Sequence, residues 1–104
     1  MNAIHVIRKD DPSLPQIRPV KEMGEGIFSS GDWSVSEARA NSLIGGRIYF
    51  HRTQAKASFF GGTVIKVKSS AVAGRVIFIF EYDPQCRGVI TPPEGWSQEK
   101  KYDP

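Results

Sequence analysis

The chain has 104 residues, the usual size of one domain, and its content of 39% hydrophobic and 24% charged residues is ordinary for a globular protein. No apolar run approaches the roughly 20 residues that span a bilayer, and "MNAIHVIRKDDP" lacks the small-residue cleavage site of a signal peptide. Cys86 is the single cysteine and excludes an internal disulfide, so we expect a cytoplasmic protein.

Residues 3–33 predict a strand, an extended arm and a turn. "AIHVIRK" (3–9) alternates and is rich in β-branched residues, which is typical of a short strand. Pro12, Pro15 and Pro19 fix φ and remove amide donors, so this segment should lie on the surface or along a sheet edge. "GEGIFSSGDW" (24–33) has the Gly and Ser content of turns.

The stretch "WSVSEARANSLIGG" (33–46) predicts a helix. Ser34 or Ser36 can cap its start, Glu37 favours its first turn, and Gly45 can take the left-handed position after its end. Trp33, just before the helix, allows two interpretations. Its side chain packs the start of the helix against the core, or it places an indole at the mouth of a pocket.

Three strands should follow, over residues 47–51, 62–68 and 75–82. The turn "SSAVAG" joins the last two into a hairpin, and the strand at 75–82 is apolar on both faces, which predicts a central position. A short strand is expected at 89–91. This order predicts one α+β domain with a small curved or closed mixed sheet and one or two short helices. Residues 1–30 would form its first strand and arm, and residues 31–104 a barrel-like body.

Positive charge is concentrated in the middle of the chain. Residues 38–80 carry seven basic residues and no Asp or Glu, while the rest carries the other seven against all 11 acidic residues. Such a block is typical of polyanion binding, or of a surface whose charges are balanced in the fold. If the strands at 47–51 and 62–68 are neighbours, their outward positions give one cationic face, and we expect phosphate contacts from Arg47, His51, Lys56, Lys66 and Lys68.

Aromatic residues beside small polar ones suggest a base-binding site. "RTQAKASFFGG" turns from polar to aromatic, so one of Phe59 and Phe60 should be core and the other can face a cleft. In "WSQEKK" an aromatic is followed by hydrogen-bonding groups near the end of the sequence. The hypothetical ligand-binding set is therefore Trp33, Ser58, Phe60, Trp96, Ser97, Gln98 and Glu99.

Other chemistries have no sequence support. His5, His51 and Cys86 do not have metal-ligand spacing, no phosphate-loop motif is present, and Cys86 beside Arg87 has no identifiable base. We therefore expect no metal, no cofactor and no catalytic residues.

The order of "SFFGG", "RVIFIF", "CRGV" and "GWSQEKK" resembles a family of small uncharacterised bacterial proteins. More distantly, a Trp before a helix followed by Gly-containing strands is similar to the PUA-like superfamily, with its ASCH, EVE and YTH domains. That resemblance implies a pseudo-barrel that binds RNA or a modified base in an aromatic pocket. The "G-x-K-x-x-E-x-R" stretch of ASCH domains is missing here, where the chain reads "QAKAS".

Three functions follow, in order of preference. The first is a non-enzymatic module that binds nucleic acid, a nucleotide or a modified base. The second is a protein-interaction module that docks an acidic partner. The third is a small nucleotide- or RNA-processing enzyme of ASCH-like type, dependent on Lys56 or Glu99.

Overall fold

The computed structural model describes residues 2–7, 21–24, 26–71, 73–97 and 100–103. The predicted Pro-rich arm and two members of the ligand-binding set, Gln98 and Glu99, lie outside these residues. The described elements are β1 (Ala3–Ile7), β2 (Lys21–Gly24), β3 (Ile27–Trp33), α1 (Glu37–Ser42), β4 (Arg47–His51), β5 (Ser58–Ser69), β6 (Val76–Tyr82), a 3-10 turn η1 (Pro84–Cys86) and β7 (Lys100–Asp103).

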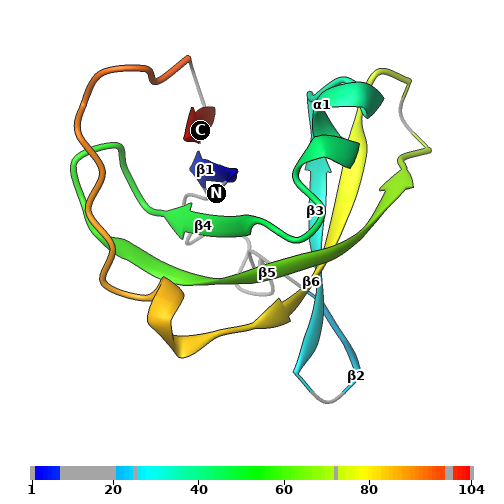
Figure 1. Cartoon of the computed structure of the whole chain (residues 1–104), viewed down its shortest axis with the longest axis horizontal. Helices are drawn as coiled ribbons and strands as arrows, with labels where there is room; N and C mark the ends of the chain where they lie inside the picture. The colour runs from blue at the N-terminus through cyan, green and yellow to red at the C-terminus, as the bar shows by residue number, and fades with distance from the viewer. Residues whose placement is uncertain (1, 8–20, 25, 72, 98–99, 104) are drawn as a thin grey trace, which may run out of the picture.

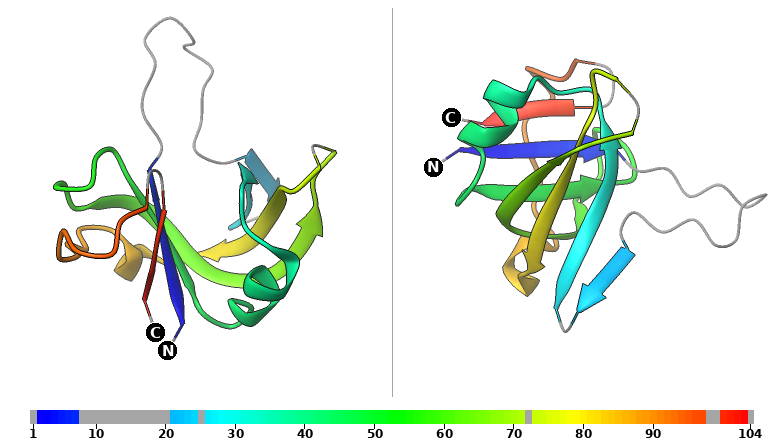
Figure 2. Two further views of the ribbon diagram at one scale, coloured as in Figure 1. Left: turned by 90° about the horizontal axis from the view of Figure 1, so that it is seen from above. Right: turned by 90° about the vertical axis from the view of Figure 1, so that its right-hand side faces the viewer.

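The strands form one mixed sheet in the order β2-β3-β6-β5-β4-β1-β7 (Figure 1). The pairing of β1 with β4 is parallel, and the other pairings are antiparallel. The first strand of the sequence therefore lies between β4 and the last strand, β7, and both chain ends lie at the same side of the molecule (Figure 2).

The sheet is strongly curved because β5 bends as it passes from β4 to β6 (Figure 1). Its ladder with β6 shifts register between Val64 and Lys66, and such a bulge increases local bending. The β6 backbone leaves no room for a side chain at Gly62, since a Cβ there would stand 1.9 Å from the carbonyl oxygen of Glu81. Only glycine fits that position.

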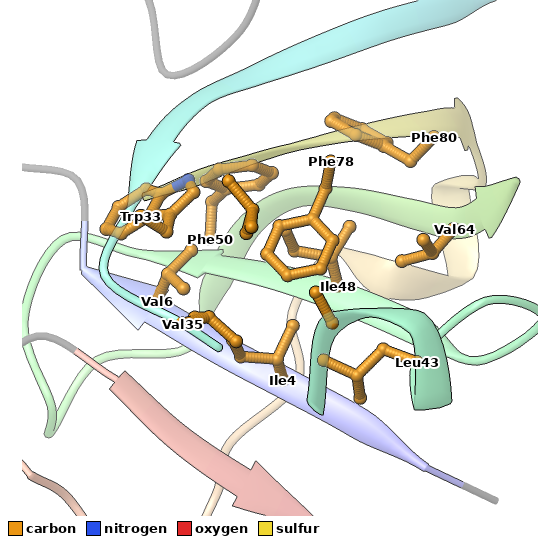
Figure 3. Packing of buried hydrophobic residues seen from close by; sticks show 12 residues of the cluster. Ile4, Val6, Trp33, Val35, Leu43, Ile48, Phe50, Val64, Phe78 and Phe80 are labelled. Carbon is orange, nitrogen blue, oxygen red and sulfur yellow. The ribbon is translucent and has the colours of Figure 1, made fainter. Parts of the chain in front are cut away.

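A hydrophobic core fills the concave side of the sheet. Figure 3 shows its labelled members, which come from β1, β3, β4, β5 and β6 and, through Val35 and Leu43, from the two ends of α1. Phe50, Phe78 and Phe80 are the largest of the fully buried side chains, and burial of each such ring contributes about 1.5–3 kcal/mol.

The helix begins where the sequence predicts. Ser36 caps α1 by accepting a hydrogen bond from the Arg39 amide at 3.2 Å, and Gly45 has a φ of 88° after the helix end. Ala40 and Leu43 face the core, so a helix of six residues depends on tertiary packing for its stability.

The prediction of a small mixed sheet with short helical elements is confirmed, and two local predictions are wrong. Residues 27–33, expected as part of a turn, form β3, because Phe28 and Trp33 pack into the core and Ser30 accepts a hydrogen bond from the Phe78 amide at 3.0 Å. Residues 89–91 form no strand. The strand expected at 62–68 begins earlier, at Ser58.

No helix within the described residues is long and apolar enough to cross a membrane.

Candidate functional site

A polar cluster is buried on the side of β1 and β4 that faces away from the hydrophobic core. Strand alternation sends Ile4, Val6, Ile48 and Phe50 into the core, as predicted for β4, and His5, Tyr49 and His51 to the opposite face. The parallel register sets His5 opposite Tyr49, and their rings stack with centroids 4.6 Å apart.

Three hydrogen bonds join this cluster into a chain. His5 Nε2 lies 2.6 Å from Asp103 Oδ2 on β7, and His5 Nδ1 lies 2.8 Å from His51 Nε2. His51 Nδ1 lies 2.9 Å from the carbonyl oxygen of Lys56, in the loop between β4 and β5. The chain therefore connects an edge strand, two inner strands and a loop.

The number of protons in this chain follows from its donors and acceptors. With Asp103 ionised, the contacts to the carboxylate and to the Lys56 carbonyl both require an N–H donor, and the contact between the rings requires one more. Three protons on four ring nitrogens make one imidazolium, whose charge the Asp103 carboxylate balances. When both imidazoles are neutral, one of the three contacts sets two acceptors against each other.

Burial opposes that imidazolium. His5 is 1% exposed and His51 is fully buried, and this desolvation lowers the pKa of both below the ordinary imidazole value. The hydrogen bond and charge of Asp103 act to raise the pKa of His5, and the Lys56 carbonyl does the same for His51, while nearby Lys101 lowers both. The third proton is therefore taken up on the acid side of the ordinary imidazole range.

Trp96 covers the histidine pair. Its ring meets the His51 ring edge-on with centroids 5.6 Å apart and lies 6.3 Å from the His5 ring. The Trp96 Nε1 atom is buried and has no hydrogen-bond partner among the described residues. The Trp96 ring therefore packs against the buried histidines.

Lys101 ties the loop that carries Trp96 to the sheet. This lysine is 7% exposed, and its Nζ donates to Thr91 Oγ1 at 2.7 Å and to the Pro92 carbonyl at 2.6 Å. Its side chain also passes Gly95, where an added Cβ would stand 3.4 Å from Lys101 Cε. A buried ammonium with two strong acceptors is a firm attachment point.

A second polar cluster, formed by Arg47, Asp83 and Cys86, lies at the start of β4. Arg47 Nη1 donates to Asp83 Oδ2 at 2.8 Å and lies 3.5 Å from Cys86 Sγ. The Cys86 side chain is fully buried, and this burial raises the pKa of its thiol. Ser58 Oγ donates to the Cys86 carbonyl and accepts from the Val89 amide, so it fastens the same segment to β5.

The three aromatic residues expected to enclose a base do not share one cavity. Trp33 is 5% exposed, packs near Phe50 in the core, and donates from Nε1 to the Ser30 carbonyl. Phe60 stacks on Tyr82 at 4.7 Å on the core side, whereas Trp96 lies over the histidines on the opposite face. The interpretation that Trp33 packs into the core is confirmed. The prediction that Trp33, Phe60 and Trp96 line one binding pocket is wrong.

Two further members of the predicted ligand-binding set lie within the described residues, Ser58 and Ser97. Ser58 is buried in the attachment of the η1 segment, so its hydroxyl is already used. Ser97 is exposed and forms an isolated bridge with Lys100.

The predicted phosphate contacts separate into two groups. His51 is buried and Arg47 is paired with Asp83. The prediction that these two residues contact phosphate is therefore wrong. Lys56 is exposed in the loop before β5. Lys66 and Lys68 are exposed at the other end of β5, beyond the stretch that pairs with β4, and neither forms an ion pair with another described residue. The predicted continuous cationic face is therefore divided along β5.

A pocket of about 270 Å³ opens between α1 and the paired ends of β1 and β7. Its lining residues are Asn2, Arg39, Ser42, Leu43, Tyr102 and Asp103. Asp103 thus belongs to the pocket wall and to the histidine chain. Among the described residues, no group of three or more His, Cys, Asp or Glu side chains is arranged to hold a metal ion.

Sequence reasoning did not identify His5, Lys101, Asp103 or the pocket residues as parts of a site. The signal that could have found the histidines is strand alternation, which places His5 opposite Ile4 and Val6 in "AIHVI" and His51 opposite Ile48 and Phe50 in "RIYFH". The two histidines contact each other because β1 and β4 pair in parallel. These strands are more than 40 residues apart, and the distance between them in the sequence does not reveal the pairing. Comparisons with protein-family models, with curated proteins and with solved structures find no match to this chain.

Proposed function

We propose that this protein is a non-enzymatic module that binds the phosphate backbone of nucleic acid through the outer face of the β5–β6 hairpin. The observation that carries the proposal is the pair of exposed cations Lys66 and Lys68 on alternate positions of β5, neither of which is ion-paired within the described part of the chain. Arg75, exposed at the start of β6, adds a third cation beside them, because Val76 pairs with Ser69.

This surface suits the backbone of nucleic acid better than its bases. The neighbours of the two lysines across the ladder are Ile77 and Ile79, with no aromatic ring between them to stack on a base. Binding through phosphates alone is independent of sequence and depends strongly on salt.

We also infer that the curved sheet is a pseudo-barrel of the PUA-like kind, since β5 bends continuously from β4 to β6.

The buried histidine chain argues against an enzymatic role for that cluster. A general acid or base must come within hydrogen-bond reach of its substrate, and His5 and His51 are shielded by Tyr49 and Trp96. Only Asp103, with 39% of its side chain exposed, reaches the surface.

The test is fluorescence anisotropy with labelled 12-nucleotide RNA and DNA strands and a DNA duplex across a range of salt. Three phosphate contacts predict a slope of log K against log salt of about −2 for single strands and about −2.7 for the duplex. The double variant Lys66→Glu/Lys68→Glu should weaken binding at least tenfold at low salt. The matched control Lys56→Glu/Arg87→Glu makes the same change in net charge at exposed positions away from the hairpin and should weaken binding much less.

Equal losses in both double variants would mean that net charge and not this surface controls binding. Tight binding of polyglutamate that salt affects equally, with no preference for nucleic acid, would favour docking of an acidic protein. Absence of binding to every probe at low salt would remove the proposal.

A further inference from the structure

The pocket between α1 and β7 presents one unpaired cation at its wall. The Arg39 guanidinium lies over the Tyr102 ring, 4.4 Å from its centroid, and forms no ion pair with another described residue. Stacking on an aromatic ring holds a guanidinium in one plane and leaves its N–H groups at the edge for bidentate contact with a planar anion. A carboxylate fits that edge best.

The other polar groups around the pocket are mainly acceptors. Asn2 Nδ2 donates to the Ser42 carbonyl at 3.0 Å, which fixes the amide and leaves its Oδ1 without a partner among the residues that the structure describes. Ser42 Oγ donates its proton to the Arg39 carbonyl at 2.6 Å, so the hydroxyl can only accept from a ligand. Asp103 uses Oδ2 for His5 and has Oδ1 left over.

We propose that this pocket binds a small zwitterion that carries a carboxylate and a primary amine, of the size of a simple amino acid. Arg39 would hold the carboxylate, and the acceptors of Asn2, Ser42 and Asp103 would receive the ammonium protons. Leu43 and Tyr102 supply the apolar wall between them. The site is independent of the nucleic-acid surface, since it shares no residue with the β5–β6 hairpin.

The charge balance of the pocket favours such a ligand over a simple anion or cation. Arg39 alone would select anions, but the Asp103 carboxylate and two neutral acceptors oppose a second negative charge. A volume of about 270 Å³ lies just below the usual range for pockets that bind drug-sized molecules, so a ligand of amino-acid size fits it.

The experiment is a titration of the full ¹⁵N-labelled chain followed by amide NMR. The probes are glycine, β-alanine, γ-aminobutyrate and 5-aminovalerate, which differ in the distance between their charges, with acetate and methylamine as single-charge probes. We expect saturable shifts at Asn2, Arg39, Ser42 and Tyr102 for at least one zwitterion below about 20 mM, and none for the single-charge probes. The variant Arg39→Gln should weaken binding at least about tenfold.

Arg52→Gln is the matched control, because Arg52 also lies over an aromatic ring, 5.0 Å from the Phe59 centroid, in a different part of the protein. It should leave the affinity unchanged. Arg39→Lys, which keeps the charge but loses the planar fork, should fall between the parent and Arg39→Gln. No saturable shifts with any zwitterion, equal binding of acetate, equal binding of methylamine, or equal losses in the Arg39→Gln and Arg52→Gln variants would each overturn the proposal.

Discussion

His5 Nδ1 and His51 Nε2 lie 2.8 Å apart inside a parallel strand pair, and Asp103 and the Lys56 carbonyl occupy the two outer ring nitrogens. This arrangement places a titratable pair between the edge strand β7 and the loop before β5. Its protonation therefore affects how firmly these two segments are held.

The stability of the protein should fall as the pH decreases below the ordinary imidazole pKa of 6.5. Because burial lowers the pKa of both histidines in the folded chain, the unfolded chain binds protons first, and each proton taken up in that window favours unfolding. Urea unfolding at pH 5, 6, 7 and 8 measures this slope. His51→Gln, which keeps a donor for His5 Nδ1, should reduce it, and a flat profile in the parent between pH 5 and 7 would contradict the linkage.

Asp103→Asn should lower the pKa of His5 further. The carboxylate contributes both a hydrogen bond and a negative charge that raise this pKa against the effect of burial, and the amide keeps only a neutral acceptor. The loss of a charge-assisted hydrogen bond should also cost about 1 kcal/mol of unfolding free energy. Ring-proton NMR titration of His5 reports the pKa, and an unchanged or raised value would show that Asp103 does not control this ring.

Lys101→Met should loosen the loop over residues 91–97. The substitution keeps most of the aliphatic stem but leaves Thr91 Oγ1 and the Pro92 carbonyl without their donor, at a cost of about 1–3 kcal/mol. Faster hydrogen exchange at Trp96 and a shift of its fluorescence would report the release. Lys100→Met serves as a comparison, because Lys100 is half-buried and its Nζ donates to the Ser34 carbonyl, outside this loop. Equal effects of the two substitutions on the loop would argue against its attachment through Lys101.

Gly62→Ala should destabilise the protein severely, by about 3 kcal/mol or more, because the added Cβ would stand 1.9 Å from the Glu81 carbonyl oxygen and the two strands would have to separate. Gly74→Ala offers a contrast. Its Cβ would enter open space, so only the positive φ of 79° opposes the substitution, at roughly 1 kcal/mol. Thermal unfolding of both variants separates the effect of close contact at Gly62 from that of backbone strain at Gly74. Similar decreases in unfolding temperature for the two variants would refute the distinction.

Cys86 should react slowly with a thiol reagent in the folded protein. Cys86 is the last residue of η1 and its side chain is fully buried, which raises the pKa of the thiol, so the reactive thiolate is scarce. Arg47→Ala removes a neighbour that lowers this pKa, which by itself would slow the reaction. It also frees Asp83 from its ion pair, and we expect the resulting opening of the segment to outweigh the pKa effect and speed the reaction. Rapid labelling of the parent at neutral pH would contradict a sealed site.

Local sequence determined the elements whose signals lie within a few residues. Ser36 caps the helix because its hydroxyl reaches an amide three residues ahead, and the alternation in 47–51 separates Ile48 and Phe50 from the polar face. The antiparallel hairpin of β5 and β6 follows from a short turn between two apolar runs.

Only the tertiary structure decided which polar side chains meet. Arg47 and His51 occupy the face that alternation assigns to them, yet the covering loops turn that face into a buried one, and Trp33, Phe60 and Trp96 pack in separate environments. The physical reason is that the partners of His5 are 46 and 98 residues away, and such pairings are chosen by the joint burial of the whole sheet and not by local preference.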